Sequence, residues 1–138
     1  MIRYGLTMAL LYATIAAVWG LAGVVAFAGQ SLVALLLLET INYIEHYGLR
    51  RAETAPGQYE RVTARHSWDS NHRFSNWLLI NLARHADHHL LASKRYQTLD
   101  PTEAAPQLPA GYGTMILVAL VPPLWRRLMD PRLSTSSN

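Results

Sequence analysis

The sequence predicts an all-α integral membrane protein, in which a transmembrane helical hairpin precedes cytoplasmic amphipathic helices that carry clustered histidines. Hydrophobic residues make up 51% of the 138 positions and charged residues only 15%. Arg3 is the only Asp, Glu, Lys or Arg in the first 38 positions, and such charge-free stretches are typical of membrane-spanning helices. We therefore divide the chain into a hairpin at 1–50 and a cytoplasmic or interfacial helical region at 51–138.

The composition excludes several functional classes. The chain has no cysteine, which excludes disulfides, iron–sulfur clusters, thiolate-bound zinc and a cysteine nucleophile. The net charge is +3, but the arginines lie beside apolar segments and form no single basic stripe. We therefore expect a lipid bilayer as a partner and no nucleic acid.

The first helix of the hairpin is expected at 4–28, which is 25 positions without a charge. A helix of this length is about 37 Å long, whereas the hydrocarbon core of a bilayer is about 30 Å thick. The alternative is a cleaved signal peptide, because Ala26–Ala28 has the A-x-A form. The apolar part of a signal peptide is usually about 7–15 residues long, which favours the transmembrane helix.

The second helix is expected at 31–47, after a short turn at Gly29–Ser31. It would be about 25 Å long, which is sufficient when one end lies at the membrane interface. Arg3 precedes the hairpin and four arginines follow it, at positions 50, 51, 61 and 65. The positive-inside rule then places both ends of the hairpin in the cytoplasm.

The rest of the chain is expected outside the bilayer, because its apolar runs are too short to span one. The expected elements are a loop at 52–70, an amphipathic helix from Ser70 or Ser75 to Leu91, an irregular segment at 93–111, a packed or interfacial helix at Tyr112–Val121 that Pro122 and Pro123 end, and a disordered tail at Ser134–Asn138.

Polar residues gather at the end of the second predicted helix. The spacing of Glu39, Asn42, Tyr43 and His46 places them on one helix face. Ionisable groups in hydrocarbon cost several kcal/mol, so this face should point to protein or to a polar cavity. The alternative is that these residues reach the interface and are solvated there.

All six histidines lie between positions 46 and 89. His85, His88 and His89 have i, i+3 and i+4 spacing, so a helix would place their imidazoles together. Traced backwards, the same face carries Asn81 and then the apolar Leu78, Trp77 and Phe74, so the histidines continue a largely apolar stripe. The stripe directs the imidazoles to the interior, where they could bind iron, copper, nickel or zinc. The alternative is a structural cluster held by hydrogen bonds.

Three polar residues near the cluster have weaker signals. His66 and His72 are six positions apart, which suits neither a helical pair nor a familiar metal motif, so we expect structural roles. Asp87 lies between the histidines of RHADHH. It could orient an imidazole by accepting its distal N–H, or it could be a solvated charge.

NYIEHYGL, at Asn42–Leu49, resembles the signature of a known family, the membrane-bound alkane 1-monooxygenases with a non-haem di-iron centre. LARHADHH, at Leu82–His89, resembles the third histidine box, LQRHSDHH, and departs from it at Ala83 and Ala86. RHSWDSNH, RYQTL and LPAGYGTMILVALVPPLWRR are similar to later segments of the family, in the same order.

The resemblance covers nearly all of this chain but only the C-terminal third of a family member. The family's two earlier boxes, H-E-x-x-H and E-H-x-x-G-H-H, do not occur in the sequence. We therefore expect a C-terminal portion whose N-terminal part is missing and which is inactive alone. By motif, the resemblance implies iron as the cofactor and His46, His85, His88 and His89 as metal ligands; no other catalytic residue carries over.

The resemblance also implies an activity and a location. Family members hydroxylate the terminal carbon of medium- or long-chain n-alkanes with O2. They receive electrons from rubredoxin, which is itself reduced by rubredoxin reductase. The implied location is the bacterial inner membrane, crossed several times, with the metal on the cytoplasmic side. The alternatives are another histidine-box oxygenase or desaturase, a small non-enzymatic membrane protein with a residual metal site, or a half completed by a separate N-terminal chain.

Overall fold

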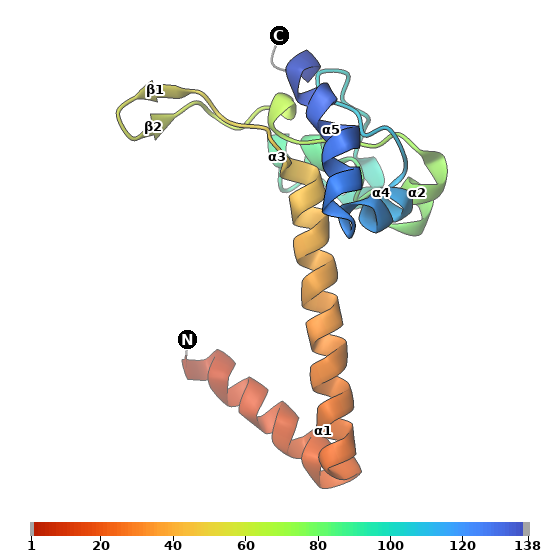
Figure 1. Ribbon diagram of the computed structural model, residues 1–138. Coiled ribbons are helices and arrows are strands. Elements are labelled where there is room, and N and C mark those ends of the chain that lie inside the picture. Colours follow the sequence, from red (N-terminus) through yellow and green to blue (C-terminus); the bar gives the residue numbers. More distant parts are fainter. Residues whose placement is uncertain (1, 137–138) are drawn as a thin grey trace. The chain divides into compact units, whose positions relative to one another are not determined.

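The structure, a computed structural model that describes residues 2–136, is mostly helical (Figure 1). The elements in chain order are α1 (Ile2–His46), β1 (Glu53–Ala55), β2 (Gln58–Tyr59), the 3-10 helix η1 (Ala64–His66), α2 (Arg73–Leu78), α3 (His85–Leu90), the 3-10 helix η2 (Tyr96–Thr98), α4 (Tyr112–Ala119) and α5 (Pro122–Ser136). Internal contacts divide the chain into two units, Met1–Glu39 and Thr40–Asn138. In the described part of the chain, one helix is long and apolar enough to cross a membrane, in agreement with the predicted class.

The first unit is a helix with a break at Gly20. Gly20 has φ 65° and ψ −160°, a conformation that glycine adopts without steric cost and other residues rarely adopt. The turn expected at Gly29–Ser31 was wrong, because these residues are helical. A glycine inside a helix costs only about 1 kcal/mol relative to alanine. The Ser31 hydroxyl donates to the Phe27 carbonyl at 2.8 Å, so it is accommodated within the helix.

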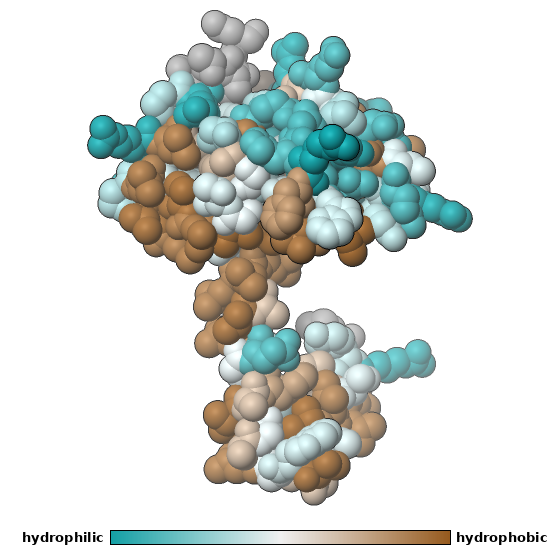
Figure 2. Space-filling view, turned by 90° about the vertical axis from the view of Figure 1, so that its right-hand side faces the viewer, coloured by the Kyte–Doolittle hydropathy of each residue, from teal (hydrophilic) through white to brown (hydrophobic). Residues whose placement is uncertain are grey.

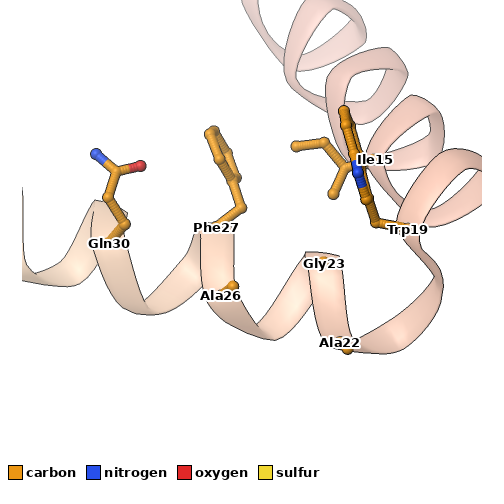
Figure 3. Close-up of a pocket in the computed structure, with 7 residues that line it drawn as sticks. All are labelled: Ile15, Trp19, Ala22, Gly23, Ala26, Phe27 and Gln30. Carbon is orange, nitrogen blue, oxygen red and sulfur yellow. The ribbon is translucent and has the colours of Figure 1, made fainter.

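Side chains from the two segments beside Gly20 face each other (Figure 3). The rings of Tyr12 and Phe27 meet edge to face with centroids 5.4 Å apart. A pocket of about 500 Å³ is lined by Ile15 and Trp19 from one segment and by residues including Phe27 from the other. Ile15 is the one buried residue among positions 2–39. Nearly all of the apolar side chains of this unit are therefore exposed or only partly buried.

The second unit has a hydrophobic core of its own. Its buried members are Ile44, Trp68, Ala83, Leu108, Tyr112, Met115, Trp125 and Met129. They come from the end of α1, the loops around α2 and α3, and both α4 and α5. The last turns of α1 thus belong to a packed body and differ from the exposed turns before them.

A small β-hairpin occupies part of the region expected to be a loop, so the all-α prediction was wrong there. β1 and β2 pair antiparallel with Glu53 opposite Tyr59. Gly57 has φ 75°, and its N–H donates to the Glu53 carboxylate at 2.7 Å. The Pro56–Gly57 dipeptide therefore forms a tight hairpin turn, a common use of glycine with positive φ.

The single helix expected from Ser70 or Ser75 to Leu91 forms two short helices, α2 and α3. Between them Ile80 and Asn81 have φ values of 54° and 61°. Asparagine tolerates this left-handed conformation better than most residues, and the Asn81 amide donates to the Tyr96 carbonyl at 3.0 Å. The tertiary bond therefore stabilises a break that helical periodicity does not reveal.

The break also overturns the expected apolar stripe that leads to the histidines. Phe74 and Trp77 on α2 are 70% and 79% exposed. They do not continue the face of the α3 histidines into the interior. Trp68 and Trp125, in contrast, are core residues.

The helix expected at Tyr112–Val121 is α4, which ends before the two prolines as predicted, and the prolines also begin a further helix. α4 ends at Ala119 and α5 starts at Pro122, since proline lacks only an N–H that the first turn of a helix leaves unpaired anyway. The tail expected at Ser134–Asn138 is helical up to Ser136. Residues 137–138 lie outside the described part of the chain.

Candidate metal centre

Three of the four predicted ligands converge in the second unit. His46 ends α1, while His85 and His89 lie one turn apart on α3. One ring nitrogen from each lies within 4.8 Å of the other two. The Nε2 atoms of His46 and His89 are 3.2 Å apart, and the rings of His85 and His89 have centroids 4.4 Å apart. We call His46, His85 and His89 the histidine triad.

The end of α1 places His46 for this contact. Gly48 follows the helix with φ 70°, and the Leu49 N–H bonds back to the His46 carbonyl at 3.2 Å. A left-handed glycine just beyond the last turn is a common helix terminator. The chain then returns along the helix end, where the Trp68 N–H donates to the Glu45 carbonyl at 2.8 Å.

Asp69 fixes the start of α3 beneath the triad. It is fully buried, and its Oδ1 accepts the Ala86 N–H at 2.8 Å. A carboxylate that accepts an N–H in the first turn stabilises a helix, as an N-cap does. Burial raises the pKa of Asp69 to about 6, and its backbone hydrogen bonds oppose this rise. Asp69 was not predicted as a site residue, although it lies in the RHSWDSNH motif.

The imidazole of His46 is held in one tautomer. Its Nδ1 lies 2.9 Å from the Asn42 carbonyl oxygen, which can only accept. Nδ1 must therefore carry the proton, and in the neutral ring Nε2 keeps the lone pair toward His89. A histidine whose outer nitrogen bonds to a carbonyl is the usual arrangement of a metal ligand.

His85 is neutral and is held by a carboxylate. Burial and the neighbouring imidazoles, His89 first, lower the pKa of His85 to about 3. Burial also lowers the pKa of His89. The Nε2 of His85 lies 3.2 Å from Oε2 of Glu45. Because this imidazole is uncharged, the contact is a hydrogen bond from N–H to carboxylate and not an ion pair.

Glu45 and Tyr112 support the triad, although neither was predicted as a site residue. Glu45 is 3% exposed, and its Oε1 accepts the hydroxyl of the fully buried Tyr112 at 3.0 Å. Burial and the Glu45 carboxylate raise the pKa of Tyr112, which therefore remains a neutral donor. The signal was present in the sequence, because Glu45 follows Ile41 by one turn and adjoins Ile44 on the helix face that packs into the core.

The face predicted from Glu39, Asn42, Tyr43 and His46 differs from the one that is buried. Glu39, Asn42 and Tyr43 are exposed, whereas Ile44 and Glu45 are buried. His46 lies between these two sides and is partly buried.

The other predicted residues lie outside the triad. His88 is exposed, and its ring centroid is 5.9 Å from that of His85. His66 bonds to Glu60 at 3.2 Å and accepts the Thr63 N–H at 2.9 Å. His72 precedes α2, and its Nδ1 lies 3.0 Å from the Ser70 hydroxyl.

Asp87 contributes to a surface network. Its Oδ2 accepts Lys94 at 2.7 Å and the Asp100 N–H at 2.8 Å. These contacts of Asp87 are therefore to the segment after α3 and not to an imidazole of the triad.

The triad fits a transition metal. Its imidazoles are close together, His85 is kept neutral, and a carbonyl and a carboxylate orient two of the three rings. Three nitrogen ligands leave room for substrate or further ligands, as in catalytic sites. Imidazole suits iron, copper, nickel and zinc, so the ligand set alone selects none of them.

Comparisons with known proteins identify the family of the chain. The family model described as fatty acid desaturase matches residues 1–119. Alkane 1-monooxygenase 2 of Alcanivorax borkumensis is 56% identical over 125 residues, which are 91% of this chain and 33% of that protein. Alkane 1-monooxygenase 2 of Pseudomonas aeruginosa is 51% identical over 115 residues, 83% of this chain and 30% of that protein.

A more distant similarity is to the xylene/toluene monooxygenase hydroxylase component of Pseudomonas putida, at 29% identity over 133 residues. The chain spans about a third of the length of the alkane 1-monooxygenases it matches, whose similarity confirms the resemblance drawn from the motifs. Because the family model covers most of its length, the chain belongs to the fatty acid desaturase family.

Proposed function

We propose that this chain forms part of an alkane 1-monooxygenase that hydroxylates the terminal carbon of medium- or long-chain n-alkanes with O2. The observation that carries the proposal is the histidine triad, found in a chain 56% identical to an alkane 1-monooxygenase. The proposed ligands are His46, His85, His88 and His89, and the proposed metal is iron in a di-iron centre. When bound, iron supplies the activation of O2.

Within this proposal, the chain's own residues hold the ligands in place. Glu45 accepts the N–H of His85, and Tyr112 in turn donates to Glu45. Such outer contacts fix the orientation of a ligand and raise its basicity. The triad and its supports come from α1, α3 and α4, so the centre depends on the packing of all three.

A pocket beside the centre supports an apolar substrate. It measures about 470 Å³ and is lined by Leu79, Ile80, Leu82, His85, His88, Tyr96 and Leu99. An apolar lining excludes water and accepts an alkyl chain without unpaired polar groups. His88 shares this wall with His85, and its proposed role as a ligand rests on the LARHADHH motif.

The partners and the location belong to the same proposal. Rubredoxin, with its reductase, would supply electrons at the cytoplasmic face of a bacterial inner membrane that the protein crosses several times. The support is the long apolar helix and the exposed Arg50 and Arg51 soon after it. The 138 residues alone should be inactive, because H-E-x-x-H and E-H-x-x-G-H-H do not occur among them.

A chimera tests the function. The matching third of the Alcanivorax alkane 1-monooxygenase 2 is replaced by this chain, and 1-alkanol formed from an n-alkane is measured by gas chromatography. We expect product from the chimera, none after His85→Ala, and near-normal product after His72→Ala, the matched histidine control. A folded, iron-loaded chimera without product would contradict the proposal, and oxidation of xylene in place of alkane would favour the xylene-type alternative.

A further inference from the structure

An exposed apolar surface lies on the second unit and includes no residue of the triad. It is formed by Phe74, Trp77 and Leu78 of α2 and by Leu117, Leu120 and Leu124, from α4 to the start of α5. We call these six residues the apolar platform. Each is at least 49% exposed, which for large hydrophobic side chains grouped together indicates an interaction surface.

The two halves of the platform are adjacent. The Tyr112 N–H at the start of α4 donates to the Ser75 hydroxyl of α2 at 3.0 Å. Gly111 permits this approach, because a Cβ there would collide with the Ser75 hydroxyl. A pocket of about 600 Å³ is lined by both helices and includes Phe74, Leu78 and Leu117. In Figure 2, hydrophobic side chains of this unit gather along its lower edge and hydrophilic ones lie above them.

The charged residues nearest the platform in the sequence are positive, and the exposed Asp130 follows Arg126 by one turn. Arg73 directly precedes Phe74, and Arg126 and Arg127 follow Leu124 by two and three positions; all three are exposed. Neither 70–86 nor 104–129 contains an Asp or Glu. Aromatic and leucine side chains with flanking arginines are typical of helices that lie in the interface of a bilayer.

We infer that the apolar platform inserts into the headgroup boundary of a membrane containing anionic phospholipid. The leucines and Phe74 would enter the acyl region, Trp77 would lie near the headgroups, and the arginines would pair with lipid phosphates. A second copy fits less well, because a two-fold contact through this surface brings two cationic rims together. Insertion of the platform does not depend on the proposed reaction, because no triad residue belongs to the platform.

The absence of cysteine makes a direct test possible. Trp77→Cys and Leu117→Cys carry a nitroxide on the platform, and Gln58→Cys on the β-hairpin is the exposed control. The full chain is reconstituted in vesicles with and without phosphatidylglycerol. Collision of each nitroxide with apolar O2 and with a water-soluble nickel chelate is then measured by electron paramagnetic resonance.

We expect the two platform nitroxides to collide with O2 severalfold more than with the nickel chelate, and the Gln58→Cys nitroxide to show the opposite. Nickel access equal to that of the control would overturn the inference. Low access to both reagents would also overturn it, because protein would then cover the surface. An R126Q/R127Q background should make the platform labels shallower only in anionic vesicles; equal depth in both lipids would refute the role of the arginines.

Discussion

The two units of this chain are built for different surroundings. Among residues 2–39 one side chain is buried, although nearly all are apolar, while the unit from Thr40 onward packs two tryptophans and a tyrosine into its core. In the first unit the helix pairs its backbone N–H and C=O groups with one another, as it must in a bilayer, where no water is available to bond them. In the second unit, polar side chains such as Glu45 and Asp69 are buried as well, and they lie beside the histidines that could bind a metal. α1 belongs to both, so one helix changes its role near Glu39.

The largest expected difference in the free energy of unfolding comes from the core of the second unit. Trp125 is fully buried, and its ring lies 5.3 Å from those of Tyr43 and Tyr47. We expect Trp125→Ala to lower the free energy of unfolding by about 3–5 kcal/mol. Trp77→Ala, at an exposed site, should change it by less than about 0.5 kcal/mol in detergent. Denaturant unfolding in micelles measures both, and equal losses would show that the second unit has no core of the kind described.

The next effect concerns the polar groups that the core holds. Glu45→Gln replaces one of the two side-chain oxygens that accept from His85 and Tyr112, so we expect metal affinity to fall about 10–100-fold. Glu39→Gln, on the exposed part of the same helix, should leave it unchanged. Titration with Co²⁺, followed by its visible absorption, compares the two variants. An unaltered affinity in Glu45→Gln would remove Glu45 from the centre.

The break in the first unit can be tested with two glycines of one helix. Gly20→Ala places a side chain at φ 65°, and we expect a cost of about 1–2 kcal/mol. Gly29→Ala lies in regular helix and should stabilise the chain by about 0.5–1 kcal/mol. Unfolding in mixed micelles with increasing dodecyl sulfate measures the difference. The same sign for both variants would contradict a break at Gly20.

The smallest expected effect is at the surface of the second unit. Lys94→Met removes the bonds to Asp87 at 2.7 Å and to Asp100 at 3.0 Å. The Lys94–Asp87 pair is partly buried and the Asp100 carboxylate is exposed, so the two pairs together contribute little and salt screens them in part. We expect a slight drop in Tm at low salt that vanishes at about 1 M, where the screening length is about 3 Å. A drop as large as that of Trp125→Ala would mean that this network is structural.

Sequence patterns predicted the local features of the site. The i, i+4 spacing placed His85 and His89 on one face of a helix, and the charge-free run predicted the long apolar helix. Both depend on residues close in the chain, which periodicity describes directly.

Features that depend on distant contacts were missed or placed wrongly. The break before α3 is held by Asn81, whose partner Tyr96 lies 15 residues away. Glu45 became important only because Tyr112, 67 residues later, packs against it. Pro122 both follows the end of α4 and begins α5, whose Trp125 packs into the core formed with α1 and α4, a contact that local sequence patterns do not reveal.

The central claim is that His46, His85 and His89 form one metal site. Its most direct test is Co²⁺ binding by the purified 138-residue chain, measured together with that of His46→Ala, His89→Ala and His72→Ala. We predict one tightly bound Co²⁺ in the wild type and in His72→Ala, and its loss in the other two. A chain that binds no Co²⁺, or that binds it equally in all four forms, would contradict the account.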